Sequence, residues 1–207
     1  MGNNNFSEFQ GLDELYIAEV TKDDNETGGG YETGEPVKIP AAEISVSTSR
    51  ESAAKYYDNA AFFIAQSEGD DEATLTVPQL PISLIGKITG KTVDETTGAL
   101  LDDGEPRAKY FAIGYRLRFL DGTYRYVWRL KGSIKLGDEA AKTLDGSTDS
   151  NNQQLTYTGT KTIHKFEKTG KAAKAVVVDE REEKADVSTW FDAVVTPDTI
   201  KASTPSA

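Results

Sequence analysis

The sequence predicts a mostly β fold: an antiparallel β-sandwich or partial barrel with one short flanking helix, extended loops and terminal arms. Three observations lead to this prediction. Several runs alternate between apolar and polar residues, which is the period of a strand with one face against a core. Asp121-Gly122 separates two of these runs, and this dipeptide is a strong signal for a tight hairpin. Apolar residues at helical spacing occur in one short stretch, residues 80–90.

The bulk composition limits the classes of function. A length of 207 residues suits one domain, and a hydrophobic content of 37% indicates a modest core or a subunit completed by its neighbours. The net charge of −11 argues against binding nucleic acid through a general electrostatic surface, because phosphate contacts require a basic one. The chain has no cysteine, which excludes disulfides, thiolate nucleophiles and cysteine-ligated metals.

The chain is predicted to form a single domain, residues 11–197, between two flexible ends. Residues 1–10 are polar and rich in asparagine, which indicates a flexible N-terminal arm, and residues 198–207 are a flexible tail containing serine and proline. Pro81 is acceptable in the first turn of the predicted helix. Strands ahead of the central hairpin are predicted at 11–21, 37–48 and 74–77.

Residues 49–73 are predicted to be a long, partly ordered loop between two strands. The loop contains acidic residues and an aromatic cluster, which either packs on the chain's own core or inserts into a neighbouring subunit. Because the core is sparse, insertion into a neighbour is the favoured interpretation. The loop residues predicted to contact another subunit are Tyr56, Tyr57, Asp58, Phe62 and Phe63.

The most informative stretch is the hairpin at residues 109–136. A two-residue type I′ loop at Asp121-Gly122 fixes the register of the two strands, with Phe119 opposite Tyr124 and Tyr115 opposite Trp128. Aromatic pairs of this kind suit a half-buried sheet. The predicted core of the hairpin, with its turn, comprises Phe111, Ile113, Tyr115, Leu117, Phe119, Asp121, Gly122, Tyr124, Tyr126, Trp128 and Leu130.

The same register collects arginine on the opposite face of the hairpin. Arg118 lies opposite Arg125, with Arg116, Arg129 and Lys131 nearby, so this face either stays solvated or meets acidic groups. Arginine is enriched at interfaces because its planar guanidinium pairs with carboxylates. Arg116, Arg118, Arg125 and Arg129 are therefore predicted to contact acidic residues of another copy, such as those at 68–71.

After the hairpin, the sequence predicts a polar loop at 137–153 and strands at 154–166 and 173–178. Residues 187–195 carry Trp190-Phe191 and are predicted to form a short helical turn.

No motif predicts catalysis. His164 is the only histidine and is interpreted as structural, which removes most of the usual parts of an acyl-transfer triad. The adjacent carboxylate pairs, such as Asp102-Asp103, read as solvated turns, and no segment has the spacing of a calcium-binding EF-hand or phosphate-binding loop. The expectation is a protein without enzymatic activity, cofactor or metal. The sequence also predicts no secretory signal and no membrane span, and hence synthesis in the cytoplasm.

Three segments in order resemble a known family. They are residues 11–18, residues 112–128 with Asp121-Gly122 at their centre, and residues 190–197 with Trp190-Phe191 at their start. Together they are similar to the major tail proteins, or tail tube proteins, of phages with long non-contractile tails that infect Gram-positive bacteria (the phi13-type major tail proteins). Tyr56-Tyr57-Asp58 lies where the family has a short tyrosine–acid motif. Residues 137–153 depart from the family by their length.

The resemblance implies the phage tail tube fold, a β-sandwich with a flanking helix, and a structural role in the virion tail. Copies would form hexameric rings that stack into the tube through which DNA passes to the host during genome ejection. Implied partners are further copies of the chain, the tape measure protein, and the tail tip and tail terminator proteins; DNA would be in transit and not specifically bound. The alternatives are a tube component of a contractile secretion system and a β-sandwich binding or adhesin module.

Overall fold

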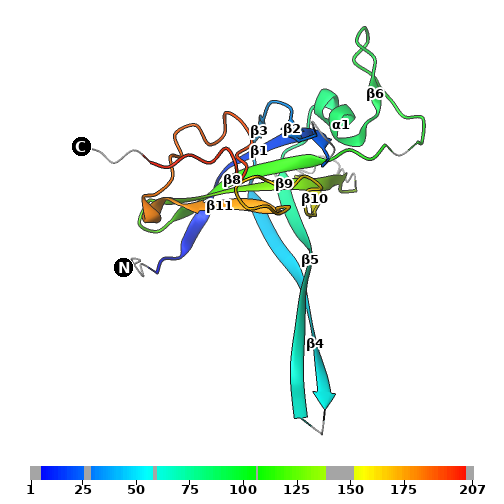
Figure 1. The fold of residues 1–207 in the computed structure, drawn as a ribbon. Helices are drawn as coiled ribbons and strands as arrows, with labels where there is room; N and C mark the ends of the chain where they lie inside the picture. Colours follow the sequence, from blue (N-terminus) through cyan, green and yellow to red (C-terminus); the bar gives the residue numbers. More distant parts are fainter. Residues whose placement is uncertain (1–5, 26–28, 58–59, 106, 139–151, 204–207) are drawn as a thin grey trace, which may run out of the picture.

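The computed structural model describes residues 6–25, 29–57, 60–105, 107–138 and 152–203, and within these ranges the side chains of 53–65 are not described. The fold is mostly antiparallel β, with one nine-stranded sheet, a two-stranded hairpin and one α-helix, and the described strands do not close into a barrel (Figure 1). The large sheet comprises β1 (Phe9–Asp23), β2 (Tyr31–Thr33), β3 (Val37–Ile39), β4 (Glu43–Tyr57), β5 (Ala60–Val77), β8 (Phe111–Phe119), β9 (Tyr124–Leu136), β10 (Gln153–Gly159) and β11 (Ala175–Asp179). The small hairpin pairs β6 (Thr92–Val93) with β7 (Leu100–Leu101).

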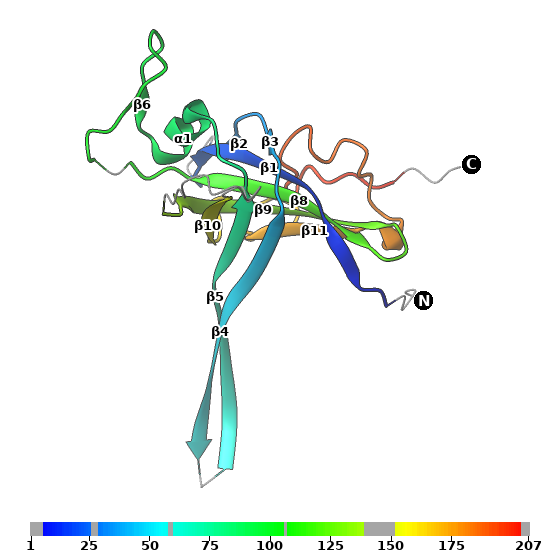
Figure 2. The same cartoon turned by 180° about the vertical axis from the view of Figure 1, so that it is seen from behind.

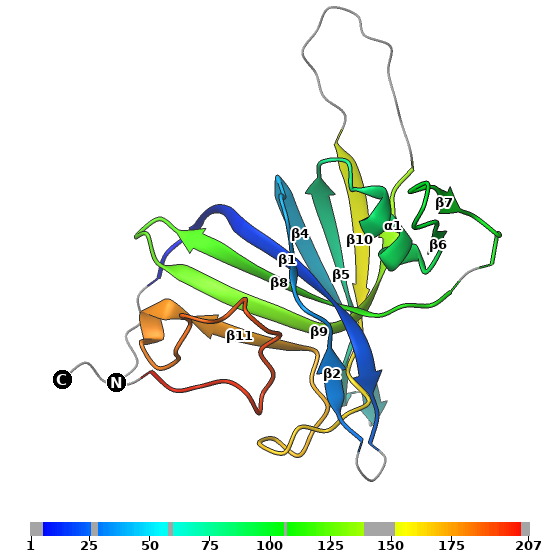
Figure 3. The same cartoon turned by 90° about the horizontal axis from the view of Figure 1, so that it is seen from above.

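The large sheet is curled, and two of its strands, β1 and β9, each pair with three others. Its order is β2-β1-β8-β9-β10-β5-β4, with β3 added to β1 and β11 added to β9. Strand β9 pairs with β11 through its first half and with β10 through its second half. The chain also runs from β3, which pairs with β1, directly into β4, which pairs with β5, so it connects the two margins of the sheet (Figure 3).

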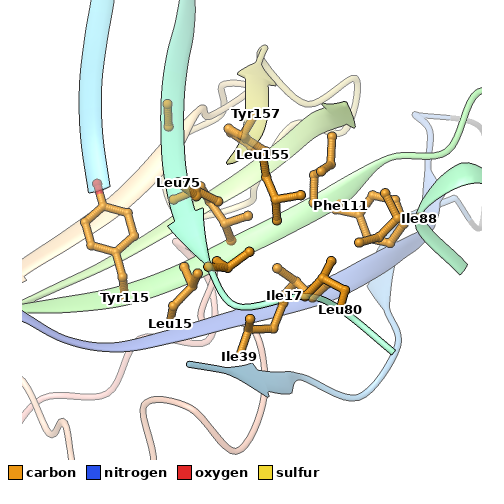
Figure 4. Close-up of a cluster of buried hydrophobic side chains, with 14 of the residues drawn as sticks. Leu15, Ile17, Ile39, Leu75, Leu80, Ile88, Phe111, Tyr115, Leu155 and Tyr157 are labelled. Atoms are coloured by element: carbon orange, nitrogen blue, oxygen red, sulfur yellow. The ribbon is translucent and has the colours of Figure 1, made fainter. Parts of the chain in front are cut away.

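Both faces of the curled sheet are buried. The inner core lies on the concave side and gathers side chains from β1, β3, β5, β8 and β10, together with helix α1 (Ile82–Thr89) (Figure 4). The outer core lies on the other face, where the C-terminal part of the chain covers the sheet through Phe166, Trp190 and Val194. Trp128, one of the two tryptophans of the outer core, is fully buried and donates its Nε1–H to the carbonyl of Trp190 at 2.9 Å.

Helix α1 confirms the prediction of one helix between residues 80 and 90. Pro81 stands at its N-cap with extended backbone, and Gly90 ends it in the left-handed region at φ 71°. Glycine is favoured there because a Cβ would be strained at positive φ. The side chain of Ile88 packs in the inner core, so one side of the helix faces that core.

The central hairpin forms between β8 and β9, but its register is one residue away from the prediction. Gly114 pairs with Trp128 and Tyr115 pairs with Val127. The amide of Phe119 donates to the carbonyl of Thr123 at 2.8 Å, and Gly122 has φ 88°. The loop is therefore the longer kind in which a left-handed glycine closes a bulge, and not a two-residue type I′ turn.

This shift overturns the prediction that the hairpin aromatics share one face. A slip of one residue sends every side chain of one strand to the opposite face. Tyr115 consequently belongs to the inner core, whereas Tyr126 and Trp128 belong to the outer core. Among the predicted hairpin core, the buried residues are Phe111, Ile113, Tyr115, Phe119, Tyr126, Trp128 and Leu130, while Leu117 and Tyr124 are half-buried and Asp121 and Gly122 are exposed.

The segment predicted as a loop, residues 49–73, is instead the distal part of a long hairpin. Strands β4 and β5 pair from Glu43 with Thr76 outward to Tyr57 with Ala60, and the register shifts twice, near Ser49 and near Lys55. Figure 1 and Figure 2 both show this hairpin projecting far from the body of the molecule. The projecting part, residues 50–68, is called the arm below.

The expected tail, residues 198–207, is attached to the body up to Ser203. Ala202 forms a β-bridge with Ala185, and the amide of Ser203 donates to the carbonyl of Lys184 at 2.9 Å. The Asp198 carboxylate also accepts hydrogen bonds from the backbone amides of Glu167 and Lys168. Residues 204–207 lie outside the described residues, as does the expected N-terminal arm up to residue 5.

Candidate interaction surfaces

The four predicted interface arginines do not form one stripe. Because of the shifted register, Arg116 and Arg118 lie opposite Tyr126 and Tyr124 on one face of the hairpin. Arg125 and Arg129 lie opposite Leu117 and Ile113 on the other face. Paired residues share a face in a sheet, so the predicted juxtaposition of Arg118 with Arg125 is wrong.

Arg129 is engaged inside the chain, at the base of the arm. Its guanidinium pairs with Asp71, and the two side chains are 14% and 7% exposed. Lys174 lies 3.5 Å from the same carboxylate, and Thr48 donates its hydroxyl to it at 2.8 Å. A buried charge requires such partners, so this cluster joins β4, β5 and β9 where the arm leaves the body.

Arg125 and Arg116 also have partners within the chain. Arg125 contacts Asp179 at 2.9 Å, and hydrogen bonds from Arg181 and Arg125 hold the pKa of the Asp179 carboxyl well below its usual range. Arg116 lies 3.3 Å from Glu14 and stacks over the ring of Tyr124 at 4.4 Å. Among the four predicted arginines, Arg118 is the exposed one and the best placed to meet another molecule.

The predicted aromatic cluster of the arm falls outside what the structure describes. Tyr56, Tyr57, Phe62 and Phe63 are in strands whose side chains are not described, and Asp58 is not described at all. The backbone still places the four aromatic residues at the distal end of the arm, farthest from the body. Nearer the body, the described arm side chains Glu51, Ser52, Gln66 and Ser67 are exposed.

Two unpaired strand edges accompany the arm. Strand β4 stands at the end of the sheet order and pairs only with β5 among the described strands. Strand β5 pairs with β10 from Asp71 onward, so along the arm its outer edge also has no partner in the part of the chain that the structure describes. Exposed edges of this kind can bind a strand of another chain, because their amide and carbonyl groups lack ladder partners.

An open cleft of about 1100 Å³ lies between the outer face of the sheet and the C-terminal segment. Its aromatic lining consists of Tyr16, Tyr126, Trp190 and Phe191, with Tyr16 and Phe191 stacked at 4.5 Å. Among the described residues that line it, Arg116 is the basic one. The acidic residues that line the cleft are Glu14, Glu180, Glu183, Asp186 and Asp192.

The sequence pattern did not reveal this cleft. The sequence predicts Trp190-Phe191 to lie in a helical turn, and the structure places a turn there, with the amide of Trp190 donating to the carbonyl of Val187. The acids around it come from β1, from the 3-10 helix η1 (Glu180–Glu182) and from irregular backbone. No short-range spacing links residues so distant in the chain.

A second buried ion pair has a structural role, because it holds a loop against the sheet. Lys131 contacts Asp23 at 2.5 Å, with the two side chains 8% and 6% exposed. Burial opposes ionisation of Asp23, but the amides of His164 and Ile163 and the Lys131 ammonium outweigh it and keep the pKa below its usual value. His164 itself lies edge-on to Phe166 and places Nδ1 3.2 Å from the carbonyl of Asp24, which is a structural contact.

Within the described ranges, no cluster of three or more histidine, aspartate or glutamate side chains is arranged to hold a metal ion. No helix in this part of the chain is long and apolar enough to cross a membrane. In comparisons with known proteins, no family model matches the sequence and no curated protein matches it.

Proposed function

We propose that this protein is a structural subunit of a phage tail tube, which self-assembles into hexameric rings that stack into a tube for the passage of DNA. In this proposal the curled sheet and its C-terminal cover correspond to the β-sandwich or partial barrel of the tail tube fold. The subunit has no catalytic role. It resides in the virion tail after synthesis in the host cytoplasm.

The arm is the observation that carries the proposal. Residues 50–57 and 60–68 pair with each other and with no other described strand. An isolated two-stranded hairpin is marginally stable in water, because it lacks a layer to pack against. A long arm of this kind is expected to gain its covering layer from neighbouring subunits, as the resemblance to tail tube proteins implies.

The open margins of the sheet agree with a ring. A ring uses heterologous contacts, in which one surface of a subunit meets a different surface of the next. The unpaired edge of β4 and the exposed Arg118 are surfaces of this kind. Engagement of Arg116, Arg125 and Arg129 inside the chain moves the proposed contact from the arginine stripe to the arm and the strand edges.

The charge of the chain suits a conduit for DNA. A net charge of −11 per copy would give a hexamer a strongly negative field. Such a tube repels the phosphate backbone and leaves DNA free to slide, with no specific binding. In the virion, the partners implied by the proposal are the tape measure protein inside the tube and the tail tip and tail terminator proteins at its ends.

Negative-stain electron microscopy of the purified full chain over a series of concentrations tests the proposal. We expect hollow rods or six-fold rings whose abundance rises with concentration. Discrete monomers across the whole series would contradict it and would favour a binding module instead.

A further inference from the structure

We propose that neighbouring copies are joined by a charge-complementary contact, in which a basic turn of one copy, residues 161–171, docks in the acidic cleft of the next. This inference rests on the proposed self-assembly and names one of its contacts. The acidic cleft is the cleft lined by Glu183, Asp186, Asp192 and the aromatic side chains around Trp190.

The cleft has unused binding capacity. Glu183 and Asp192 are exposed and form no ion pair among the described residues, whereas Glu14 pairs with Lys38 and Glu180 accepts from the amide of Tyr124. An excess of carboxylates around aromatic side chains attracts a cation, because both the charges and the ring faces favour one.

One donor in the lining of the cleft also lacks an acceptor among the described residues. Trp190 is only 2% exposed, and its Nε1 is buried without a hydrogen-bond partner among the described residues. A buried donor without an acceptor is destabilising, and it marks a place where a missing group belongs. A peptide segment that contains lysines would satisfy both the carboxylates and the donor of the cleft. Its lysines would pair with the carboxylates, and its backbone carbonyls would accept the hydrogen bond.

The chain carries a segment of the required chemistry. Residues 161–171 contain four lysines and one glutamate in a protein with a net charge of −11. The amide of Gly170 donates to the carbonyl of Phe166 at 2.8 Å, and a bridge joins Phe166 to Lys171, so the segment is a defined turn. Figure 3 shows it, in gold, projecting at the edge of the body. Its exposed lysines, which form no ion pair among the described residues, are Lys161, Lys165, Lys168 and Lys171.

A second copy is the occupant that these surfaces indicate. Identical acidic subunits repel one another at long range, so an assembly of them needs local attraction at each contact. A basic turn on one copy and an acidic cleft on the next supply it in a head-to-tail manner, which is the symmetry of a ring.

Charge reversal of each surface, with mixing of the variants, tests the contact. The turn variant is Lys165→Glu with Lys171→Glu, and the cleft variant is Glu183→Lys with Asp192→Lys. All these side chains are exposed, so both variants are expected to keep the native circular dichroism spectrum. The assembled fraction is measured by sedimentation and electron microscopy on the full chain. Lys87→Glu and Glu95→Lys, also exposed, are the matched controls.

Each reversed variant alone is expected to lose assembly at least about tenfold, since like charges then face each other at every contact. An equimolar mixture of the two should assemble again, because alternating copies bring each acidic turn to a basic cleft and each basic turn to an acidic cleft. Rescue in the mixture separates a contact between copies from one within a copy.

Three results would overturn the inference. If both variants assemble like the native chain, the contact does not exist, although the tail tube proposal stands. If the mixture fails while a single chain with all four substitutions assembles, the attraction acts within one copy. A native chain that stays monomeric at every concentration contradicts the tail tube proposal and this contact together.

Discussion

At the scale of single residues, two glycines allow large aromatic side chains to lie flat against the sheet. A Cβ placed on Gly114 would lie 2.6 Å from the ring of Trp128. A Cβ placed on Gly132 would contact the ring of Tyr157 and lie 2.6 Å from the carbonyl oxygen of Thr158. Since backbone cannot rotate away as a flexible side chain can, Gly132 is the stricter of the two positions.

We therefore expect Gly132→Ala to lower the free energy of unfolding by about 1–3 kcal/mol, the usual range for overpacking a core. Urea denaturation of the purified chain measures this loss. Gly11→Ala is the matched control, because a Cβ there has nothing within 4 Å, and its effect should stay within about 0.5 kcal/mol. Equal stability of the Gly132 variant and the native chain would mean that β9 and β10 can move apart without loss.

The hairpin shows how much local sequence determines. Alternation around Asp121-Gly122 was sufficient to locate both strands and most of their buried residues. It was not sufficient for the register, because Asp-Gly suits a two-residue turn and also the longer turn that places glycine in the left-handed region. Burial of both faces removes the remaining signal, since neither face has to be polar.

At the scale of elements, the base of the arm depends on the cluster around Asp71. Arg129→Met preserves much of the side-chain volume and removes the charge that faces the buried Asp71 carboxylate. We expect this variant to lose about 3 kcal/mol of unfolding free energy, the lower end for a broken buried pair, because Lys174 remains near.

Urea denaturation again measures the effect, with Arg118→Met as the control. Arg118 is an exposed arginine of the same hairpin, so its replacement should change stability by no more than about 0.5 kcal/mol. Similar results for the two variants would show that Lys174 balances the Asp71 charge without Arg129, with the hydrogen bond from Thr48.

The long hairpin and the cleft could not be predicted from local sequence, for two different reasons. Residues 49–73 mix alanine, serine and acidic residues without regular alternation, and they become strands by pairing with each other over a long distance. Strand pairing of this kind depends on the partner more than on intrinsic propensity. The cleft assembles residues from positions 14 to 203, which only the fold brings together.

At the scale of the whole molecule, the arm and the body share no core among the described residues. Strand β5 is fixed to β10 from Asp71 to Val77, and the inner core ends at Ala73 on this strand. Beyond Arg50 and Glu68 the arm adds backbone pairs of its own and no buried core residue among those described. This arrangement agrees with the proposed role of the arm in contacts between copies.

This separation gives the last prediction. Residues 52–66 are replaced by Asn-Gly, which joins Glu51 to Ser67, two residues that already face each other, through a two-residue hairpin loop. We expect the shortened chain to keep its near-ultraviolet circular dichroism and to melt within a few degrees of the native chain, since an effect of about 1 kcal/mol or less moves the midpoint only that far. Rods and rings should be absent from electron micrographs at concentrations where the native chain forms them. Normal assembly would remove the arm from the contacts between copies, and an unfolded body would show that the arm stabilises the subunit itself.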